Sequence, residues 1–262
     1  GSCDFVKQVS EPMPVSVFME IMGLPLDRFD EFRGLAVSAL TPPEDGEVRD
    51  QAAVHGRIMA VLMELIADRK AQPRADLVSK LLAETDIAGA NSDPQRMSIC
   101  YLLFLAGLDT VTNAMAYGVR HLAQDQQLQS QIRADRSLIP GVVEKMLRLY
   151  SFVNTHRLVK KDTELDGVQI KAGEMVWCVL WSGSNEPGGD TEGPRHMAFG
   201  GGHHLCLGMH LARLELRVMY ETWFDHIGRF SLTPDPKPAM HGGSVMNITR
   251  LLLDLEPLRV AA

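Results

Sequence analysis

The run Phe199-Gly200-Gly201-Gly202-His203-His204-Leu205-Cys206-Leu207-Gly208 carries the most specific chemistry in this chain. A cysteine follows a glycine-rich turn, and a histidine lies two residues before it. Glycine allows a positive φ, so the backbone of the turn can bend closely against a flat group. The pattern from Leu207 to Phe224 predicts a helix, and the dipole at a helix N-terminus favours a nearby thiolate, which is the form that binds metal. The run therefore indicates a cysteine that holds an iron at the start of a helix.

Three other interpretations of this run compete with a thiolate that binds heme iron. The cysteine could be a small buried apolar residue, as single cysteines often are. A zinc site could use His203, His204, Cys206 and His210, although closed zinc sites usually join two ligand pairs across a spacer and no second pair is evident. A phosphate-binding loop would need a strand–G-x-G-x-x-G–helix context and a Lys-Ser/Thr ending, which are missing. Heme iron bound through a thiolate is the favoured interpretation.

The composition argues against several classes of function. The net charge of −7 argues against nucleic acid as a partner, and no apolar run is expected to reach the length of a membrane span. Four scattered cysteines, without a basic and apolar leader, predict a reduced, cytoplasmic environment. A chain of 262 residues is long enough for one sizeable core, and we expect a single domain over residues 1–262.

Most of the chain shows the apolar spacing of helices, and the expected fold class is mainly α with small β-sheets. The apolar stretch from Gln95 to Ala123 predicts one long helix through the core. Beyond Tyr150, β-branched and alternating residues predict short strands. The other helices are expected at Pro14–Met22, Asp27–Leu40, Val48–Lys70, Asp76–Glu84, Gln126–Ala134 and Ile139–Tyr150. The strands are expected at Thr155–Lys160, Val168–Ile170, Glu174–Leu180, Phe230–Thr233 and Ile248–Leu255, and two loops at Asp86–Ser92 and Ser182–Arg195.

The pattern F-x-x-G-x-H-x-C-x-G, continued by Leu211-Ala212-Arg213, resembles the cysteine-ligand loop of the cytochrome P-450 superfamily. The resemblance covers Cys3 to Leu258 and implies the C-terminal portion of that fold, with a long central helix over a heme and the cysteine-ligand loop. It implies heme b, iron protoporphyrin IX, as the cofactor and Cys206 as the ligand of its iron. The stretches Cys3–Pro25 and Gly107–Gly173 look most like bacterial hydroxylases of the camphor or terpenoid type.

The segment Ala106-Gly107-Leu108-Asp109-Thr110 lies in the middle of the long predicted helix. A glycine inside a helix costs about 0.5–1 kcal/mol relative to alanine and so needs a reason. A threonine hydroxyl can bond to a carbonyl one turn back and bend the helix. A tolerated glycine in a packed helix is the simpler interpretation. The segment resembles the family's A-G-x-D-T motif, which implies that Asp109 and Thr110 deliver protons to oxygen on the iron and that Ala106 and Gly107 contact the cofactor.

The resemblance also assigns residues around the heme and the substrate. Heme propionates need basic partners because burying an anion is costly. Arg157 and His204 match the family's propionate contacts, although Arg157 could be an ordinary surface charge. The remaining cofactor contacts that the resemblance implies are Phe199, Gly200, Gly202 and Gly208. The substrate contacts that it implies are Leu102, Leu105, Val153, Ser244 and Val245.

Three features depart from the family pattern. Lys145 stands where the acid of an E-x-x-R motif is expected, three residues before Arg148, and Glu144 is one position away, about 100° around the helix. In the family the acid and the arginine of this motif form a buried ion pair. Either Glu144 is recruited by a local shift, or Lys145 turns to solvent, or the network around the pair is absent. Breaking a buried pair of this kind costs about 3–5 kcal/mol. The loop from Ser182 to Phe199 is shorter than usual, and the large N-terminal part of family members has no counterpart.

Two functions of different classes follow from the resemblance. The first is a heme-thiolate monooxygenase that inserts one atom of O2 into a small apolar, terpenoid-like substrate, with electrons from a separate ferredoxin and its reductase. The second is a truncated heme-binding or heme-free protein without oxygenase activity, whose exposed core surface would drive formation of a homo-oligomer. A zinc protein that uses Cys206 and its neighbouring histidines is a third hypothesis.

Overall fold

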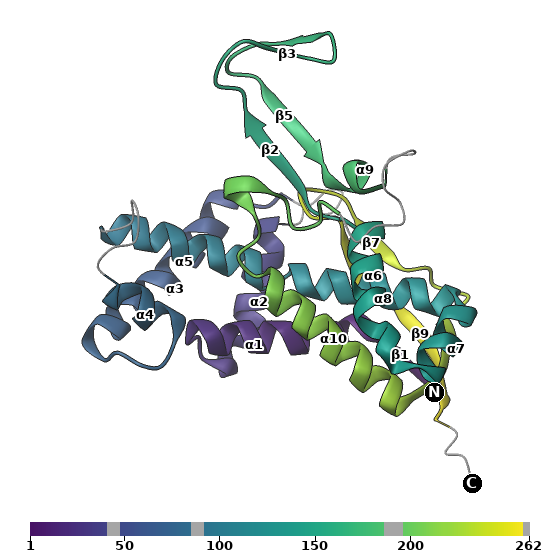
Figure 1. The fold of residues 1–262 in the computed structure, drawn as a ribbon. Coiled ribbons are helices and arrows are strands. Elements are labelled where there is room, and N and C mark those ends of the chain that lie inside the picture. Colours follow the sequence, from purple (N-terminus) through teal and green to yellow (C-terminus); the bar gives the residue numbers. More distant parts are fainter. Residues whose placement is uncertain (41–47, 85–91, 186–195, 259–262) are drawn as a thin grey trace.

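The computed structural model describes residues 1–40, 48–84, 92–185 and 196–258. In these residues helices dominate and short strands form four small sheets (Figure 1), which confirms the expected class. The helices are α1 (Pro12–Met22), α2 (Phe29–Leu40), α3 (Gln51–Ala71), α4 (Leu77–Ala83), α5 (Asp93–Gly107), α6 (Thr110–Gln124), α7 (Gln126–Ala134), α8 (Ile139–Leu149), α9 (Leu180–Asn185) and α10 (Met209–His226), with short turns η1 (Val6–Ser10), η2 (Leu26–Arg28), η3 (Arg136–Leu138) and η4 (Gly202–His204). The strands are β1 (Ser2–Asp4), β2 (Asn154–Leu158), β3 (Thr163–Leu165), β4 (Val168–Ile170), β5 (Met175–Val179), β6 (Ile227–Leu232), β7 (Ala239–His241), β8 (Asn247–Arg250) and β9 (Leu252–Pro257).

The helix ends follow local sequence signals. Helix α1 has Pro12 at its first position, where the missing N–H leaves no bond unmade, and it ends at Gly23, whose φ of 78° suits glycine. Helix α4 begins after Asp76, whose side chain accepts a hydrogen bond from the Ser79 amide (2.7 Å). These signals explain why the helices expected at these places are present.

The long helix expected over Gln95–Ala123 is two helices in the structure, so that prediction was wrong in this respect. Helix α5 ends at Gly107 and α6 begins at Thr110. Asp109, between them, has φ −135° and ψ −29°, outside the α-helical region. The Thr110 hydroxyl donates to the Ala106 carbonyl (2.9 Å), a bond that bends helices. Apolar residues on both sides of this segment favoured one continuous helix, although Gly107, Asp109 and Thr110 interrupt the apolar pattern here.

Three smaller predictions also need correction. The loop expected from Ser182 begins inside α9, which covers Leu180–Asn185. The strand expected over Ile248–Leu255 is divided into β8 and β9. The helix after the cysteine starts at Met209 and not at Leu207. The loop expected at Asp86–Ser92 lies, apart from Ser92, outside the described residues, as does the part of the second loop at residues 186–195.

The strands pair in antiparallel fashion. The three-stranded sheet has the order β1-β9-β6, so that Ser2 lies opposite Asp254. Strand β2 pairs with β5 and β3 pairs with β4, and these two ribbons project away from the helical body in Figure 1. Strand β7 pairs with β8, and a bridge between Val153 and Val245 connects this region to the start of β2.

Two groups of buried side chains form the interior. The sheet-side core joins α6, α7, α8 and α10 to the three-stranded sheet, with Phe5 and Phe230 among its members. The helical core joins α1 to α5, with the fully buried Phe32 among its members. A polar contact links the two, because Arg33 of α2 lies 3.5 Å from Asp109 at the start of α6. We propose that both cores belong to the single domain expected for residues 1–262.

The segment Asp93–Gln124, which contains α5 and α6, is long and apolar enough to cross a membrane by length and composition. By this measure, the expectation that no apolar run reaches such a length was wrong. In the structure 44% of the apolar window is buried, and the turn at Leu108 and Asp109 interrupts it. Helix α6 also packs within the sheet-side core. Core packing therefore accounts for the apolar composition of the buried part of the segment.

Gly107 lies against the ring of Phe18 from α1 so closely that a β-carbon would fall inside contact distance of the ring. We expect Gly107→Ala to lower the free energy of unfolding by about 1–3 kcal/mol, because overpacking forces the neighbours apart. Urea denaturation measures this change. Gly56→Ala in α3 is the matched control, because a β-carbon there meets no atom within 4 Å, and it should raise stability by about 0.5–1 kcal/mol. A Gly107→Ala protein as stable as the wild type would contradict the close packing.

Candidate functional site

Residues 197–208 form the cysteine loop, which directly precedes α10. The Cys206 amide donates to the Phe199 carbonyl (2.9 Å), and this bond closes the loop. Gly200 and Gly202 have φ values of 67° and 59°, which residues with a β-carbon rarely adopt. Glycine at these two positions is therefore needed to bring Cys206 to the start of the helix, as the sequence suggested.

The Cys206 residue is exposed and its thiol is free. A β-carbon at Gly202 or Gly208 would meet no atom within 4 Å, so the backbone on either side of the cysteine is uncrowded. Leu205 and Leu207 flank the cysteine and are 49% and 83% exposed. One soft sulfur donor among exposed apolar side chains fits a flat apolar group that is held through a thiolate.

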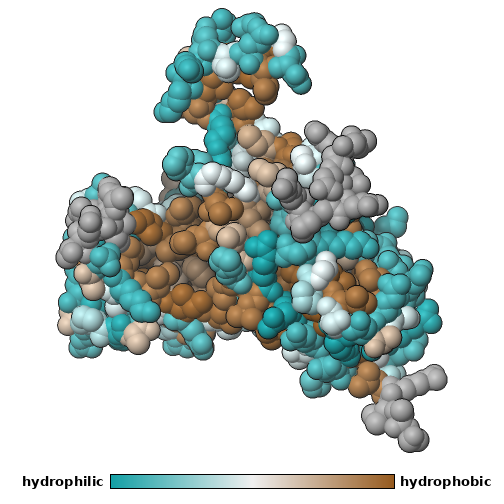
Figure 2. Space-filling model, viewed as in Figure 1, coloured by the Kyte–Doolittle hydropathy of each residue, from teal (hydrophilic) through white to brown (hydrophobic). Residues whose placement is uncertain are grey.

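An apolar, hollowed area extends across the middle of the molecular face that carries α5 and α10 (Figure 2). Leu102 of α5 is 65% exposed, and Leu214 and Val218 of α10 are also exposed. Large exposed apolar areas mark surfaces that a ligand or a partner covers. Leu102 is thus available to an apolar ligand, whereas Leu105 is half-buried and packs on the helical core.

The zinc hypothesis loses its support in the structure. In the part of the chain that the structure describes, no group of three or more His, Cys, Asp or Glu side chains is arranged to hold a metal ion. The four residues considered for zinc, which are His203, His204, Cys206 and His210, are all exposed and do not converge. A closed zinc site needs four converging ligands.

Glu144 of α8, one position away from the expected acid of the E-x-x-R pattern, forms an ion pair with a residue of another helix. Arg213 of α10 binds it in bidentate fashion, with Nε 2.6 Å from Oε1 and Nη2 2.9 Å from Oε2, and His196 Nε2 lies 3.1 Å from Oε2. Burial alone would raise the pKa of the Glu144 carboxyl, but the hydrogen bonds from His196 and Arg213 outweigh burial and lower the pKa to about 2. Lys145 is exposed. The alternative in which Lys145 turns to solvent therefore holds, whereas Glu144 is bound by Arg213 and His196.

Asp109 is 2% exposed and lies where the helical core meets α6. Its Oδ1 is 3.5 Å from Arg33 Nη2, which also binds Glu11 (2.7 Å). Its Oδ2 accepts a hydrogen bond from Asn113 Nδ2 (3.1 Å). Burial raises the pKa of Asp109 to about 6, although the Arg33 charge opposes the rise. A carboxyl with this pKa can take up or release a proton near neutral pH.

The other residues of the 106–110 segment lie at the helix break. Thr110 is half-buried and bonds to the carbonyl of Ala106, which is itself exposed. Gly107 faces Phe18, so the packing of α1 explains why glycine occurs there. The simpler interpretation of Gly107, a glycine in a packed helix, is thus the one that the geometry supports.

Arg157 of β2 and His204 of η4 are both exposed. Arg157 Nη1 donates to the neighbouring His156 carbonyl (2.7 Å). Among the described residues, neither Arg157 nor His204 forms an ion pair with a carboxylate. Both side chains are therefore available to an anionic group such as a propionate.

The three residues expected to contact substrate outside α5 do come together. Val153 and Val245 form an antiparallel bridge, and the Asn154 amide donates to the Ser244 carbonyl (2.8 Å). Val245 is buried, whereas Val153 and Ser244 are half-buried. These two half-buried residues could touch a ligand without a change of backbone.

The sequence interpretation missed two asparagines that fix Asp109. Asn113 Nδ2 donates to the Asp109 carboxylate and to Asn247 Oδ1 of β8 (3.0 Å). The Ile248 amide donates to Asn113 Oδ1 (2.8 Å). Both asparagines are buried. An amide four residues after Asp109 in an apolar helix was the available signal, because a buried polar group needs partners.

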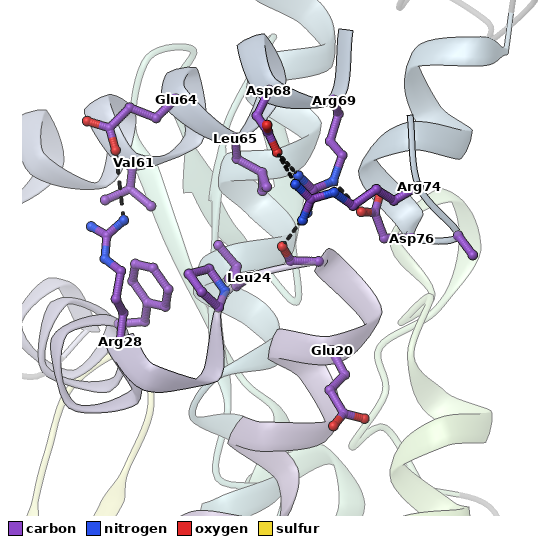
Figure 3. Close-up of a pocket in the computed structure, with 14 residues that line it drawn as sticks. Glu20, Leu24, Arg28, Val61, Glu64, Leu65, Asp68, Arg69, Arg74 and Asp76 are labelled. Carbon is purple, nitrogen blue, oxygen red and sulfur yellow. Dashed lines mark hydrogen bonds and ion pairs between the residues drawn. The ribbon is translucent and has the colours of Figure 1, made fainter. Parts of the chain in front are cut away.

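A separate cavity of about 510 Å³ lies between the end of α1, α3 and the start of α4 (Figure 3). Its charged residues pair with one another: Arg28 with Glu64 (3.8 Å) and Arg74 with Asp68 (3.1 Å). Arg69 binds Asp68, Asp76 and the Gly23 carbonyl. No lining residue belongs to the cysteine loop or to the expected site. The cavity therefore belongs to the packing of the helical core and not to the candidate site.

Glu215 of α10 is 5% exposed, and burial raises its pKa from 4.5 to about 7. Because the native state then binds more protons than the unfolded state, the free energy of unfolding falls as the pH rises from about 4.5 through about 7. We expect Glu215→Gln to remove this fall, so that the variant gains up to about 3 kcal/mol relative to the wild type across the window. Urea denaturation at several pH values measures the difference in the free energy of unfolding between the two proteins. Asp109 contributes equally to the pH dependence of both proteins, so its contribution does not appear in the difference. Parallel stability profiles would contradict the assignment.

The comparisons with known proteins agree with the geometry. The family description "Cytochrome P450" matches residues 39–188 and 185–253. The chain is 30% identical to a probable cytochrome P450 127A1 of Sinorhizobium fredii, over 96% of this chain and 62% of that protein. It is 30% identical to a steroid C26-monooxygenase of Mycolicibacterium smegmatis, over 84% of this chain and 59% of that protein.

The crystal structure of CYP109E1 from Bacillus megaterium in complex with testosterone superposes with a TM-score of 0.87 at 26% identity, over 96% of this chain and 70% of that one. The chain spans between 55% and 65% of the length of the curated relatives that it matches.

Proposed function

The chain belongs to the cytochrome P450 family, and on this premise we propose that it binds heme b through the Cys206 thiolate and acts as a monooxygenase. The proposal depends on one observation above all: the free, exposed Cys206 thiol, held before α10 by the bond from its amide to Phe199 (2.9 Å). A thiolate-bound heme supplies the cleavage of the O–O bond. In the net reaction O2, two electrons and two protons convert a C–H bond of the substrate to C–O–H and release one water.

The protons are assigned to Asp109 and Thr110. Burial raises the pKa of Asp109 to about 6, so its carboxyl can change protonation state near neutral pH. The Thr110 hydroxyl follows it directly and is half-buried. A proton taken up at the Asp109 carboxyl would pass to the Thr110 hydroxyl at the helix break.

The remaining roles follow from exposure and charge. His204 and Arg157 pair with the heme propionates, because both are exposed and neither is engaged by a carboxylate among the described residues. Ala106 contacts the heme. At Gly107, the Phe18 ring occupies the space where a side chain would lie. The loop residues that contact the heme are Phe199, Gly200, Gly202 and Gly208. The residues that contact the substrate are Leu102, Leu105, Val153, Ser244 and Val245.

The substrate is assigned to small apolar, terpenoid-like compounds. The exposed apolar side chains around α5 and the cysteine loop support this class. Two similar proteins support it as well, a steroid C26-monooxygenase and CYP109E1 in complex with testosterone. The electrons would come from a ferredoxin and its reductase, and the compartment would be the cytoplasm.

A second candidate is a heme-binding or heme-free protein without oxygenase activity that forms homo-oligomers. The observation that favours it is the exposed apolar face in Figure 2, in a chain that spans about 60% of its relatives' length. Association would cover this face.

The test is reconstitution of the purified chain with hemin. A thiolate-bound heme gives a Soret band that is shifted far to the red in the reduced, carbon-monoxide-bound protein. Turnover with a surrogate ferredoxin, its reductase and testosterone as a probe then separates the two candidates. A shifted band with hydroxylated product supports the monooxygenase, whereas a shifted band without product at matched electron supply supports the second candidate. A protein that remains colourless contradicts heme binding altogether.

A further inference from the structure

The ribbon formed by β2 and β5 has an open edge along β5. In the part of the chain that the structure describes, β5 pairs with β2 alone. The start of β2, in contrast, is also held by the bridge from Val153 to Val245. The ribbon extends away from the helical body in Figure 1. An unpaired edge offers a row of backbone donors and acceptors to a further strand, so β5 is the strand to which another can be added.

The register of the ribbon shows which backbone groups of β5 are open. The Val159 amide donates to the Glu174 carbonyl at the end of the ribbon (2.9 Å), and the same antiparallel register continues along β5. Residues in such a pair alternate between bonding to the partner strand and pointing away from it. The amides of Met175, Trp177 and Val179 therefore point away from β2 and form the open row.

The sequence of β5 lacks the usual protection of a free edge. Natural edge strands carry lysine, proline or a bulge that prevents further pairing. Residues 175–181 contain no charged residue, no proline and no glycine, and β5 runs against β2 in unbroken register from Met175 to Val179. Short uncharged segments with high β propensity pair readily with copies of themselves. The strand is thus suited to pair with an identical strand.

One face of the ribbon is also apolar and exposed. Met175, Trp177 and Val179 share this face because side chains alternate along a strand, and Leu158 of β2 lies opposite Met175. All four side chains are between 45% and 69% exposed, and apolar side chains gather on the ribbon in the upper part of Figure 2. The Trp177 ring makes an edge contact with His156, with ring centres 4.0 Å apart. The middle of the face therefore holds a large, fixed aromatic group.

From this edge and this face we propose that β5 pairs with β5 of a second copy of the chain, in antiparallel fashion about a two-fold axis at Trp177. The axis places Met175 opposite Val179 of the second copy, so outward amides meet outward carbonyls and the two apolar faces join. No like charges come opposite each other, because β5 carries none and Arg157 lies one strand further out, on β2. The strand thus complements itself in both backbone and charge.

The size of the contact sets its strength. Two strands of five residues each cover less than the roughly 800 Å² per partner of a stable interface. We therefore expect a reversible dimer with a dissociation constant of about 1–100 μM. The proposal rests on neither candidate function, and it concerns the ribbon and not the hollowed face that carries α5 and α10.

The experiment is analytical ultracentrifugation of the heme-free chain from about 1 to 200 μM, with hydrogen exchange read at the amides of β5. We expect a monomer–dimer equilibrium. At the highest concentration the Trp177 and Val179 amides should exchange at least about twofold more slowly than at the lowest, in proportion to the fraction of dimer. The amides of Val176 and Cys178 face β2 already and should not change.

Trp177→Lys places two like charges at the axis and removes the aromatic pair, so it should weaken the dimer by about tenfold or more. The matched control is Leu214→Lys, which adds the same charge at an exposed residue of α10 on the hollowed face and should leave the dimer unchanged. Trp177→Cys in a Cys206→Ala background is a second variant. It brings two thiols opposite each other at the axis, within about 5.5 Å between Cα atoms, so mild oxidation should link the two copies.

A chain that stays monomeric over the whole range overturns the proposal. A dimer that Leu214→Lys dissociates and Trp177→Lys does not overturns it too, because the hollowed face would then be the interface. Exchange at Trp177 that is independent of concentration in a dimeric sample has the same meaning. After reconstitution with hemin, absence of the red-shifted Soret band would count against the proposed function and leave these results to decide on the dimer.

Discussion

Replacement of Cys206 by alanine is expected to abolish the red-shifted Soret band of the reduced, carbon-monoxide-bound protein. The band requires a thiolate donor to the iron, and Cys206 is the exposed free cysteine of the loop before α10. Changes to groups that only orient a metal ligand cost about 10–100-fold in affinity or activity. Removal of the ligand itself should exceed that range for both heme affinity and turnover. Absorbance spectra after reconstitution and a hemin titration measure the two effects.

Cys178→Ala is the matched control for this prediction. Cys178 lies in β5, is half-buried and is also free, so its loss removes a sulfur without a change in the loop. The band should persist in this variant. A band that survives in Cys206→Ala and disappears in Cys178→Ala would transfer the ligand role to the other sulfur and end the present assignment.

Replacement of Arg69 by alanine is expected to lower the free energy of unfolding by about 3–5 kcal/mol, because it leaves a buried carboxylate without its partner. The side chains of Arg69 and Asp76 are only 3% and 6% exposed. Arg69 also donates to the Gly23 carbonyl (2.6 Å) and so ties the end of α1 to α3 and α4 (Figure 3). Urea denaturation at neutral pH measures the loss.

Arg74→Ala tests whether burial is the cause of that loss. Arg74 pairs with Asp68 in the same cluster (3.1 Å), but its side chain is 55% exposed. Exposed ion pairs contribute about 0.2–1 kcal/mol, so this variant should be close to the wild type. Equal losses of unfolding free energy in Arg69→Ala and Arg74→Ala would show that burial of the Arg69–Asp76 pair does not increase its contribution to stability.

The cysteine loop could be predicted from the sequence because its determinants are local. Gly200 and Gly202 act through their own backbone angles, and Cys206 acts through one thiol in the same short run. The helices followed from apolar spacing for the same reason, since periodicity and capping residues lie within each segment. The class of fold and the place of the candidate ligand were therefore accessible without the structure.

The sequence showed that Thr110 could bend the helix, but the break at Asp109 also has contacts that lie far away in the sequence. Phe18 fills the space beside Gly107, and Arg33 lies beside the Asp109 carboxylate (3.5 Å). The role of Glu144 was hidden in the same way. Its partners His196 and Arg213 lie 52 and 69 residues away in the sequence. Helical spacing could therefore show only that Glu144 is one residue away from the expected acid, and it could not show what Glu144 binds.

The pairing of β1 with β9 has a mechanical consequence. Ser2 lies opposite Asp254 and Asp4 lies opposite Leu252, so both strands leave the ribbon at the same end. Hydrogen bonds in an antiparallel pair run across the strands. Tension applied between Ser2 and Pro257 therefore pulls along these bonds and opens them one after another, as a zipper does, and does not load them together in shear. Under force, this ribbon should be the first part of the sheet-side core to separate.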